Sequence, residues 1–133
     1  MKPESLLFAK THEWVAVASE GGQKTATVGI TAFAVEQLTD VVAVDLPRAG
    51  KKVVAGSDKG FGEIESVKAV SDVYAPVTGE VVEVNGSIEG SEDAVNKDPY
   101  GKGWLFRIKV SDRVQLGGLQ SSDAYQALLA EQA

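Results

Sequence analysis

Hydrophobic side chains recur at every second position in several short stretches of the chain. In the clearest stretch, 104–110, tryptophan, phenylalanine, isoleucine and valine alternate with leucine, arginine and lysine. Similar alternation is found at 15–17, 26–30, 42–46 and 82–84. Alternation with a period of two is typical of half-buried β-strands, and these runs end in Gly, Pro, Asn or Asp. The pattern therefore predicts a mainly β protein, built as a sandwich or a flattened barrel.

One hairpin and two helices are also predicted. Gly21-Gly22 separates two strand-like runs and favours a tight turn. Thr31 is a suitable N-cap for a short helix ending at Leu38, because its side-chain oxygen can accept a backbone N–H of the first turn. A C-terminal helix is expected from Ser122 to Glu131 after the flexible pair Gly117-Gly118. Its apolar stripe should dock on the sheet and consists of Tyr125, Leu128 and Leu129.

An internal repeat relates two parts of the chain. The segment 40–45 (DVVAVD) matches the segment 80–85 (EVVEVN), forty residues later. Two repeats are too few for a solenoid. We therefore expect residues 40–68 and 80–109 to form two similar β halves that fold against each other, joined by an exposed connection at 68–76. Further residues match between the copies: Gly50 with Gly90, and Gly60, Gly62 and Lys68 with Gly101, Gly103 and Lys109.

Composition restricts the chemistry that the chain can perform. Its 133 residues are enough for one domain, with a core at about 6–110 and the C-terminal helix at about 122–131. Asp and Glu number 19 against 13 Lys and Arg, and the net charge of −6 disfavours binding to nucleic acid or anionic membranes. The chain has no cysteine and one histidine, His12, which excludes disulfides, thiol nucleophiles and multi-histidine metal sites. Redox or thiol chemistry would have to come from an attached or bound group.

Motifs for targeting and catalysis are missing from the sequence. No apolar run approaches the roughly 20 residues that a membrane-spanning helix needs, and residues 1–10 show neither a secretory nor a transit pattern, so a cytoplasmic location is expected. There is no phosphate loop, dinucleotide fingerprint, zinc-protease motif or nucleophile elbow. The acidic stretch 89–93 lacks the ligand spacing of a calcium loop and is interpreted as a solvated turn.

Lys68 is of interest because it lies at the expected connection between the two halves. A free lysine has a pKa of about 10.4, and the neighbouring Glu63, Glu65 and Asp72 favour its charged form. Lys68 would therefore be a poor Schiff-base amine, because such lysines need apolar burial or a nearby cation. An exposed lysine on a turn is better suited to acylation by a separate enzyme. The plain alternative is a solubilising surface lysine.

Short motifs follow one another along almost the whole chain. The segments 65–72 (ESVKAVSD) and 75–85 (APVTGEVVEVN) surround and follow the lysine. They resemble the lipoylation segment of the glycine cleavage H-protein family, and the resemblance extends from about residue 6 to 130. A biotin carrier would be expected to have Met beside the lysine, where this chain has Val67 and Ala69. Other motifs fall in the family's order: THEWV at 11–15, GIT at 29–31, LP at 46–47, GFG at 60–62 and DPYGKGWL at 98–105.

This resemblance implies a carrier rather than an enzyme. It implies one lipoyl-carrier domain, 1–133, folded as a hybrid barrel-sandwich, with lipoic acid attached to Lys68 as N6-lipoyl-lysine. The cofactor would supply the sulfur chemistry that the chain lacks. The implied partners are a pyridoxal-phosphate glycine decarboxylase (P protein), a tetrahydrofolate-dependent aminomethyltransferase (T protein), a dihydrolipoamide dehydrogenase (L protein) and the enzymes that attach lipoate. The arm would carry the aminomethyl group of glycine between the first two and be reoxidised by the third.

The resemblance also implies roles for individual residues. Thr11 and Glu13 match positions lining a cleft in which the loaded arm folds back, where Glu13 would hold the cationic amine. Asp72 is a weaker candidate for the same surface. Recognition of the attachment turn is implied for four residues, namely Glu65, Ser66, Ala69 and Asp72.

Other positions in these motifs have different expected roles. Gly62 and Gly79 are expected to be structural, permitting close packing or a bend. His12, beside Trp14, is expected to be partly buried, with no proton-transfer role. After GIT the family commonly has an acidic residue and then His or Tyr. This chain has Ala32-Phe33 instead, which removes polar groups near the proposed cleft.

Three other functions remain open on sequence alone. A related lipoyl protein could relay lipoate to other complexes or serve another pathway. A β-sandwich interaction module would carry Lys68 merely on its surface. A small hydrolase would have to use His12.

Overall fold

The computed structural model describes residues 6–9, 11–20, 23–38, 40–46, 48–54, 62–86, 93–110 and 119–132. The strands are β1 (Leu7–Phe8), β2 (Glu13–Glu20), β3 (Gln23–Ile30), β4 (Val41–Asp45), β5 (Lys52–Val53), β6 (Gly62–Ser66), β7 (Val70–Val73), β8 (Gly79–Val84) and β9 (Phe106–Val110). The helices are α1 (Ala32–Leu38), α2 (Asp93–Lys97) and α3 (Ser122–Gln132). The predicted mainly β class is confirmed.

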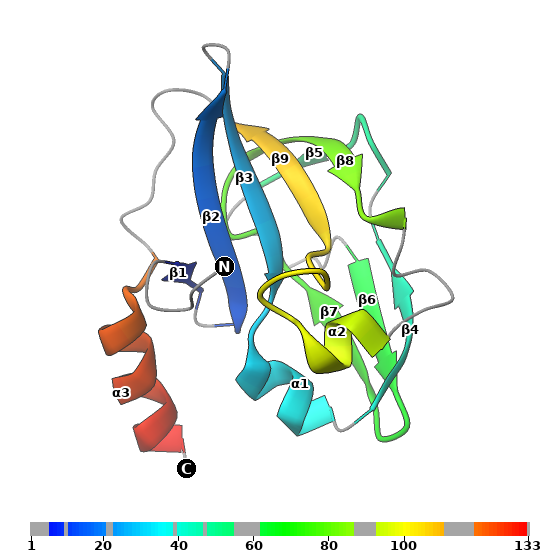
Figure 1. Ribbon diagram of the computed structural model, residues 1–133, viewed down its shortest axis with the longest axis vertical. Coiled ribbons are helices and arrows are strands. Elements are labelled where there is room, and N and C mark those ends of the chain that lie inside the picture. The colour runs from blue at the N-terminus through cyan, green and yellow to red at the C-terminus, as the bar shows by residue number, and fades with distance from the viewer. Residues whose placement is uncertain are drawn as a thin grey trace.

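The strands form two antiparallel sheets (Figure 1). One has six strands in the order β1-β2-β3-β9-β8-β5, and the other has three in the order β4-β6-β7. β2 pairs with β3 as far as Glu20 opposite Gln23. β2 and β3 therefore form the expected hairpin, and the predicted turn residues Gly21 and Gly22 lie outside the described residues. Helix α1 and the turn between β6 and β7 lie at the same end of the molecule, at the bottom of Figure 1.

The internal repeat is visible in how the strands pair. In the first copy β4 pairs with β6, and in the second copy β8 pairs with β9. Each pair has a register shift at the same place in the repeat, between Val41 and Ala43 and between Val81 and Glu83. The copies also exchange contacts, because β5 pairs with β8, and Asn96 of α2 hydrogen-bonds the backbone N–H and C=O of Val41 in β4 (2.9 and 3.2 Å). Two similar halves packed on each other are thus confirmed.

A hydrophobic core fills the space between the sheets. In β9 the alternating residues Phe106, Ile108 and Val110 are buried, as the period of two predicts. The strand begins at Phe106, so Trp104 lies outside it, and the adjacent Leu105 is fully buried instead. Alternation thus identifies the strand but places its start two residues too early.

Helix α3 docks as its apolar stripe predicts. The buried Tyr125 stacks on Phe8 of β1 at 4.6 Å between ring centroids, and Leu128 and Leu129 pack against the same cluster. Trp14 is the largest member of this cluster, and its indole N–H donates to the Pro99 carbonyl at 2.9 Å. The helix therefore covers a second, smaller core beside β1 and β2.

The connection between the two halves is exposed, as expected, only as far as Asp72. Residues 70–73 form strand β7, which pairs with β6. Beyond it, Ala75 and Val77 are buried in the main core. A strand of four residues is too short for an alternation of apolar and polar side chains to be recognised. The sequence therefore predicts neither strand β7 nor the burial of the residues that follow it.

Helix α2 was not predicted either, because five residues carry no helical period. The acidic stretch interpreted as a solvated turn lies outside the described residues except for Asp93, where α2 begins. Within the described part of the chain, none of the helices is long and apolar enough to cross a membrane.

Gly79 should be required for the packing of β8 on β9. A Cβ at this position would collide with the backbone carbonyl oxygen of Lys109 and approach the Ile108 side chain at 2.5 Å. We expect Gly79→Ala to lower the free energy of unfolding by about 2–3 kcal/mol, because backbone cannot move aside as a flexible side chain can. Urea denaturation would measure this loss. Gly86→Ala is the matched control, since a Cβ at Gly86 would have nothing within 4 Å of it; equal stability of the two variants would contradict the packing argument.

Candidate functional site

Lys68 lies in a tight turn that the Ser66 side chain organises. The Ser66 hydroxyl accepts hydrogen bonds from the backbone N–H groups of Lys68 (3.1 Å) and Ala69 (3.0 Å) and donates to the Ala69 carbonyl (3.0 Å). The backbone N–H of Ser66 donates to the same carbonyl at 2.8 Å. Ser66 is buried, so its contribution is to hold the shape of the turn. A side chain that satisfies local backbone groups is the usual way to stabilise such a turn.

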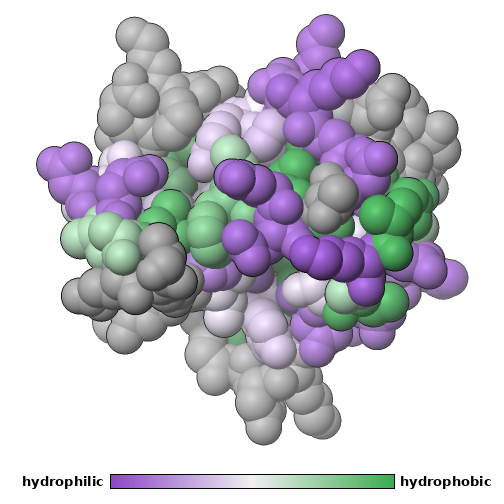
Figure 2. All heavy atoms as spheres, turned by 90° about the horizontal axis from the view of Figure 1, so that it is seen from below, coloured by the Kyte–Doolittle hydropathy of each residue, from purple (hydrophilic) through white to green (hydrophobic). Residues whose placement is uncertain are grey.

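A further contact ties the turn to the rest of the domain. The Val67 N–H donates to the Asp40 carbonyl, just before β4, at 3.1 Å. The Lys68 side chain is exposed and makes no hydrogen bond or ion pair with the described residues. A stiff turn thus presents a free amine to solvent, at the end of the molecule shown in Figure 2.

The outer face of the hairpin is acidic and partly apolar. Glu65 and Glu63 alternate with the buried Ile64 along β6, and Asp72 lies opposite Glu63 on β7. Val70, opposite Glu65, is 59% exposed. In Figure 2, hydrophilic and hydrophobic surfaces lie side by side at this end of the molecule. Glu65 and Asp72 therefore lie where an enzyme acting on Lys68 could contact them.

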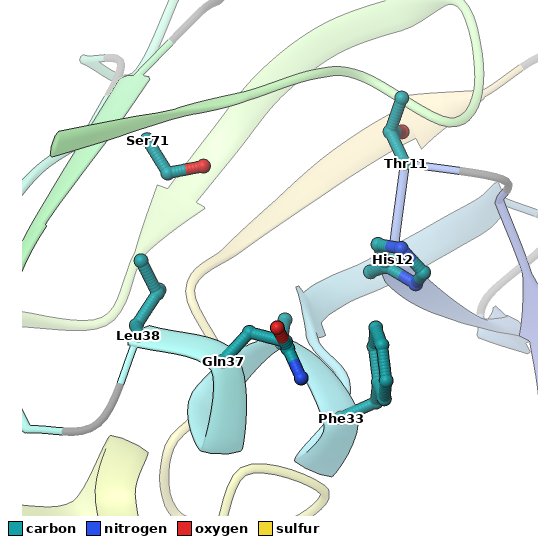
Figure 3. A pocket seen from close by; sticks show the side chains of 7 residues that line it. Thr11, His12, Phe33, Gln37, Leu38 and Ser71 are labelled. Atoms are coloured by element: carbon teal, nitrogen blue, oxygen red, sulfur yellow. The ribbon is translucent and has the colours of Figure 1, made fainter. Parts of the chain in front are cut away.

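An open cleft of about 520 Å³ lies on the other face of the hairpin. Figure 3 shows side chains from three segments around it: Ser71 on β7, Thr11 and His12 on the loop before β2, and four from α1. Ser71 is three residues beyond Lys68 on the same hairpin. The residues contributed by α1 that Figure 3 labels are Phe33, Gln37 and Leu38.

Of the residues expected at the cleft, one lines it and two do not. Thr11 lines it. Asp72 belongs to the outer face, because successive side chains of a strand point to opposite sides and Ser71 faces the cleft. Glu13 is 1% exposed and is therefore buried rather than solvated. Phe33 lines the wall of the cleft with an aromatic ring.

Glu13 is held beside Thr11 by two hydrogen bonds. The Thr11 hydroxyl donates to one carboxylate oxygen, and the Tyr74 backbone N–H donates to the other at 3.3 Å. Burial raises the pKa of Glu13 to about 7, against the smaller lowering effect of these hydrogen bonds. Near neutral pH this carboxyl group is thus close to half protonated.

Several site residues were not predicted from the sequence: Ala34, Gln37 and Leu38 line the cleft but were expected only as part of a short helix, and Ser71 and Tyr125 were also missed. Ser71 could have been found by assuming a hairpin centred on Lys68 and counting alternate positions. Tyr125 was assigned only to packing, but its hydroxyl lies 2.7 Å from His12 Nδ1 and 2.7 Å from Thr31 Oγ1. Thr31 also caps α1 as predicted, accepting the Ala34 N–H at 3.2 Å. No sequence signal connects residues so far apart in the chain.

The raised pKa of Glu13 predicts a specific pH dependence of stability. Between about pH 4.5 and 7 the folded state keeps a proton that the unfolded state has released, so the free energy of unfolding falls as the pH rises through this range. The contribution of Glu13 should amount to about 3 kcal/mol across it. Urea denaturation at several pH values would show the fall in the wild type and a smaller fall in Glu13→Gln.

The matched control removes an exposed carboxyl group instead. Glu65→Gln should keep the pH dependence of the wild type, because Glu65 lies on the outer face. A Glu13→Gln curve parallel to the wild-type curve would contradict the assignment.

Comparison with known proteins agrees with this geometry. The family model described as "Glycine cleavage H-protein" matches residues 6–132. The glycine cleavage system H protein of Aeromonas salmonicida (strain A449) is 48% identical over 130 residues, covering 98% of this chain and 97% of that protein. That of Rubrobacter xylanophilus is 53% identical over 114 residues, or 86% of each chain. A crystal structure of a glycine cleavage system H protein from Mycobacterium marinum has a TM-score of 0.85 at 36% identity and covers 97% of this chain and 99% of its own. The chain belongs to the glycine cleavage H-protein family.

Proposed function

We propose that this chain is the lipoyl carrier of a glycine cleavage system, with lipoic acid joined to the Nζ atom of Lys68 by an amide bond. The observation that carries the proposal is the exposed Lys68 on the turn fixed by Ser66. A carrier arm needs a rigid base and an accessible anchor. A mobile base would have to be ordered each time the arm enters a partner's site, and this ordering would cost conformational entropy. Tethering also raises the concentration of the arm at each partner.

The chemistry of the arm complements that of the chain. The sequence has no cysteine, so the dithiolane of lipoic acid would provide the sulfur atoms that accept the aminomethyl group. Amide formation removes the positive charge of Lys68, and an uncharged arm can lie along the protein with a smaller desolvation penalty. The chain itself acts as a carrier in this proposal, not as an enzyme.

The two faces of the hairpin would serve different encounters. On the outer face, Glu65 and Asp72 would contact lipoate-attaching enzymes, while Ser66 and Ala69 preserve the turn that these enzymes recognise. The partners that exchange groups with the arm would be the decarboxylase, the aminomethyltransferase and the dihydrolipoamide dehydrogenase. We place these encounters in the cytoplasm.

The cleft on the other face would shelter the loaded arm between visits. Thr11 and Ser71 offer hydroxyl groups, and Phe33 offers an apolar wall. Sulfur packs favourably against aromatic rings, so Phe33 can replace polar contacts with packing against the thioether. Glu13, hydrogen-bonded to Thr11, would provide negative charge for the ammonium group of the cargo.

Lys68 should be the one lysine that acquires a lipoyl group. Intact-mass measurement after expression in a lipoate-competent host should show a single adduct on the wild type and none on Lys68→Arg, which keeps the charge but cannot form the amide. Lys102→Arg is the control, since Lys102 is also exposed but lies far from the hairpin in sequence. An adduct on Lys68→Arg, or an unmodified wild type, would refute the proposal.

Glycine cleavage should be distinguishable from a lipoate relay. With a purified glycine decarboxylase, the lipoylated protein should support exchange between glycine carboxyl and bicarbonate, and the unmodified protein should not. A protein that only passes lipoate to other complexes would be lipoylated normally and give no exchange above the level without carrier. That result would favour the relay function.

A further inference from the structure

The His12 side chain is held by two aromatic residues at the edge of the cleft. Its Nδ1 atom lies 2.7 Å from the Tyr125 hydroxyl. Its ring packs against Phe33 at 4.8 Å between centroids and meets the edge of Tyr125 at 5.7 Å. These contacts fix the plane of the imidazole and occupy one of its two nitrogens. Figure 3 shows the ring beside Phe33 among the side chains that line the cleft.

Counting hydrogens identifies which nitrogen carries the proton. Thr31 is fully buried, and its Oγ1 atom already accepts the Ala34 N–H. Its hydroxyl hydrogen therefore needs an acceptor, and the Tyr125 oxygen at 2.7 Å is the partner within reach among the described residues. The Tyr125 hydrogen then points to His12 Nδ1, which must be unprotonated to accept it. The proton of a neutral His12 consequently sits on Nε2.

The Nε2–H group is left as a free donor. It has no hydrogen-bond partner among the described residues, and His12 lines the cleft. The backbone of His12 is in the left-handed region, with φ of 75°, and is held there by hydrogen bonds from its N–H to Ala9 and from Thr31 to its carbonyl. Such strain persists where surrounding contacts enforce it, often at functional positions.

We propose that His12 is a positioning residue that donates a hydrogen bond from Nε2–H to the amide carbonyl oxygen of the lipoyl arm when the arm lies in the cleft. This inference rests on the proposed attachment of lipoic acid to Lys68. The amide oxygen is the strong acceptor on such an arm, whereas thioether and disulfide sulfurs are weak ones. The contact would fix the arm at its base and leave its distal end to the cargo.

A neutral donor suits a cationic cargo. Burial lowers the pKa of His12, so the ring is uncharged near neutral pH and does not repel an ammonium group. The titratable group bonded to the ring is Tyr125, and the hydroxyl of Tyr125 is in turn influenced electrostatically by Tyr100 and Glu13. Tyr125 stays protonated, since burial raises its pKa to about 12.

The tautomer can be tested before any lipoic acid is attached. Because the chain has one histidine, a long-range proton–nitrogen NMR spectrum contains one imidazole signal set. The unmodified protein should show the Nε2–H form alone, and Tyr125→Phe should show a mixture with the Nδ1–H form. An Nδ1–H tautomer in the wild type would overturn the proposal, whether or not Lys68 can be lipoylated.

The acceptor can be tested by changing the arm. Protein acylated on Lys68 with octanoic acid has the same amide as the lipoyl form but no sulfur. Loading the lipoyl arm with the aminomethyl group should move the Nε2–H resonance downfield and slow its exchange with water relative to the unmodified protein. The octanoyl form, whose arm has no cargo to hold it in the cleft, is the control and should change less. No change in the loaded form, or an equal change in both forms, would overturn the proposal.

The consequence for the carrier can be measured with a matched pair of variants. His12→Asn tolerates the left-handed backbone and keeps a polar atom near Nδ1, but it has no donor where Nε2 was. It should shorten the lifetime of the aminomethyl-loaded protein about fivefold, as expected for one lost hydrogen bond. His12→Gln, whose longer side chain places its amide near the Nε2 position, should restore most of that lifetime.

Intact mass separates the two levels of the proposal. Failure of lipoylation in the wild type would refute the attachment to Lys68. Normal lipoylation with equal lifetimes for wild type and His12→Asn would refute the role of His12 while leaving the carrier function standing. Equal lifetimes for His12→Asn and His12→Gln, both below that of the wild type, would also overturn the proposal, because they would indicate a structural role.

Discussion

The hairpin of β6 and β7 is the constraint on which the rest of the site depends. Its turn is closed by the Ser66 hydroxyl, and its two strands direct alternate side chains to opposite faces. Glu65 and Asp72 therefore point outward, while Ser71 faces the cleft. A lysine at the tip belongs to neither face. An arm attached there can swing outward to a partner or inward to the cleft without any change in the fold.

The features of the fold that repeat along the chain could be predicted from the sequence. Alternation revealed the longer strands, and the forty-residue match revealed two halves whose register shifts fall at the same place, at Val41/Ala43 and Val81/Glu83. Thr31 and Tyr125 allowed helices α1 and α3 to be predicted, because an N-cap and an apolar stripe can both be recognised from nearby residues. Strand β7 and helix α2 were not predicted, because four or five residues are too few to show a period. Their formation also depends on partners distant in sequence.

The candidate site was only partly predictable for a related reason. The motif around Lys68 is contiguous, so its exposure on a turn follows from neighbouring residues. The burial of Glu13 does not, because it depends on Tyr74, about sixty residues away. The contact between Tyr125 and His12 spans 113 residues. The burial of Glu13 and the contact between Tyr125 and His12 both result from tertiary packing. A single sequence does not show which distant side chains come into contact.

Glu13 and His12 together determine what charge the cleft can accept. The carboxyl group of Glu13 is disfavoured as an anion by its burial, and the imidazole of His12 is disfavoured as a cation by the same cause. An ammonium group near Thr11 would favour ionised Glu13 and lower its pKa again, because opposite charges stabilise each other in a medium of low dielectric constant. Entry of the cargo and loss of the Glu13 proton would thus be linked. A cationic cargo would then stabilise the folded carrier most above neutral pH, where the carboxylate of Glu13, buried beside the empty cleft, has no counter-charge among the described residues.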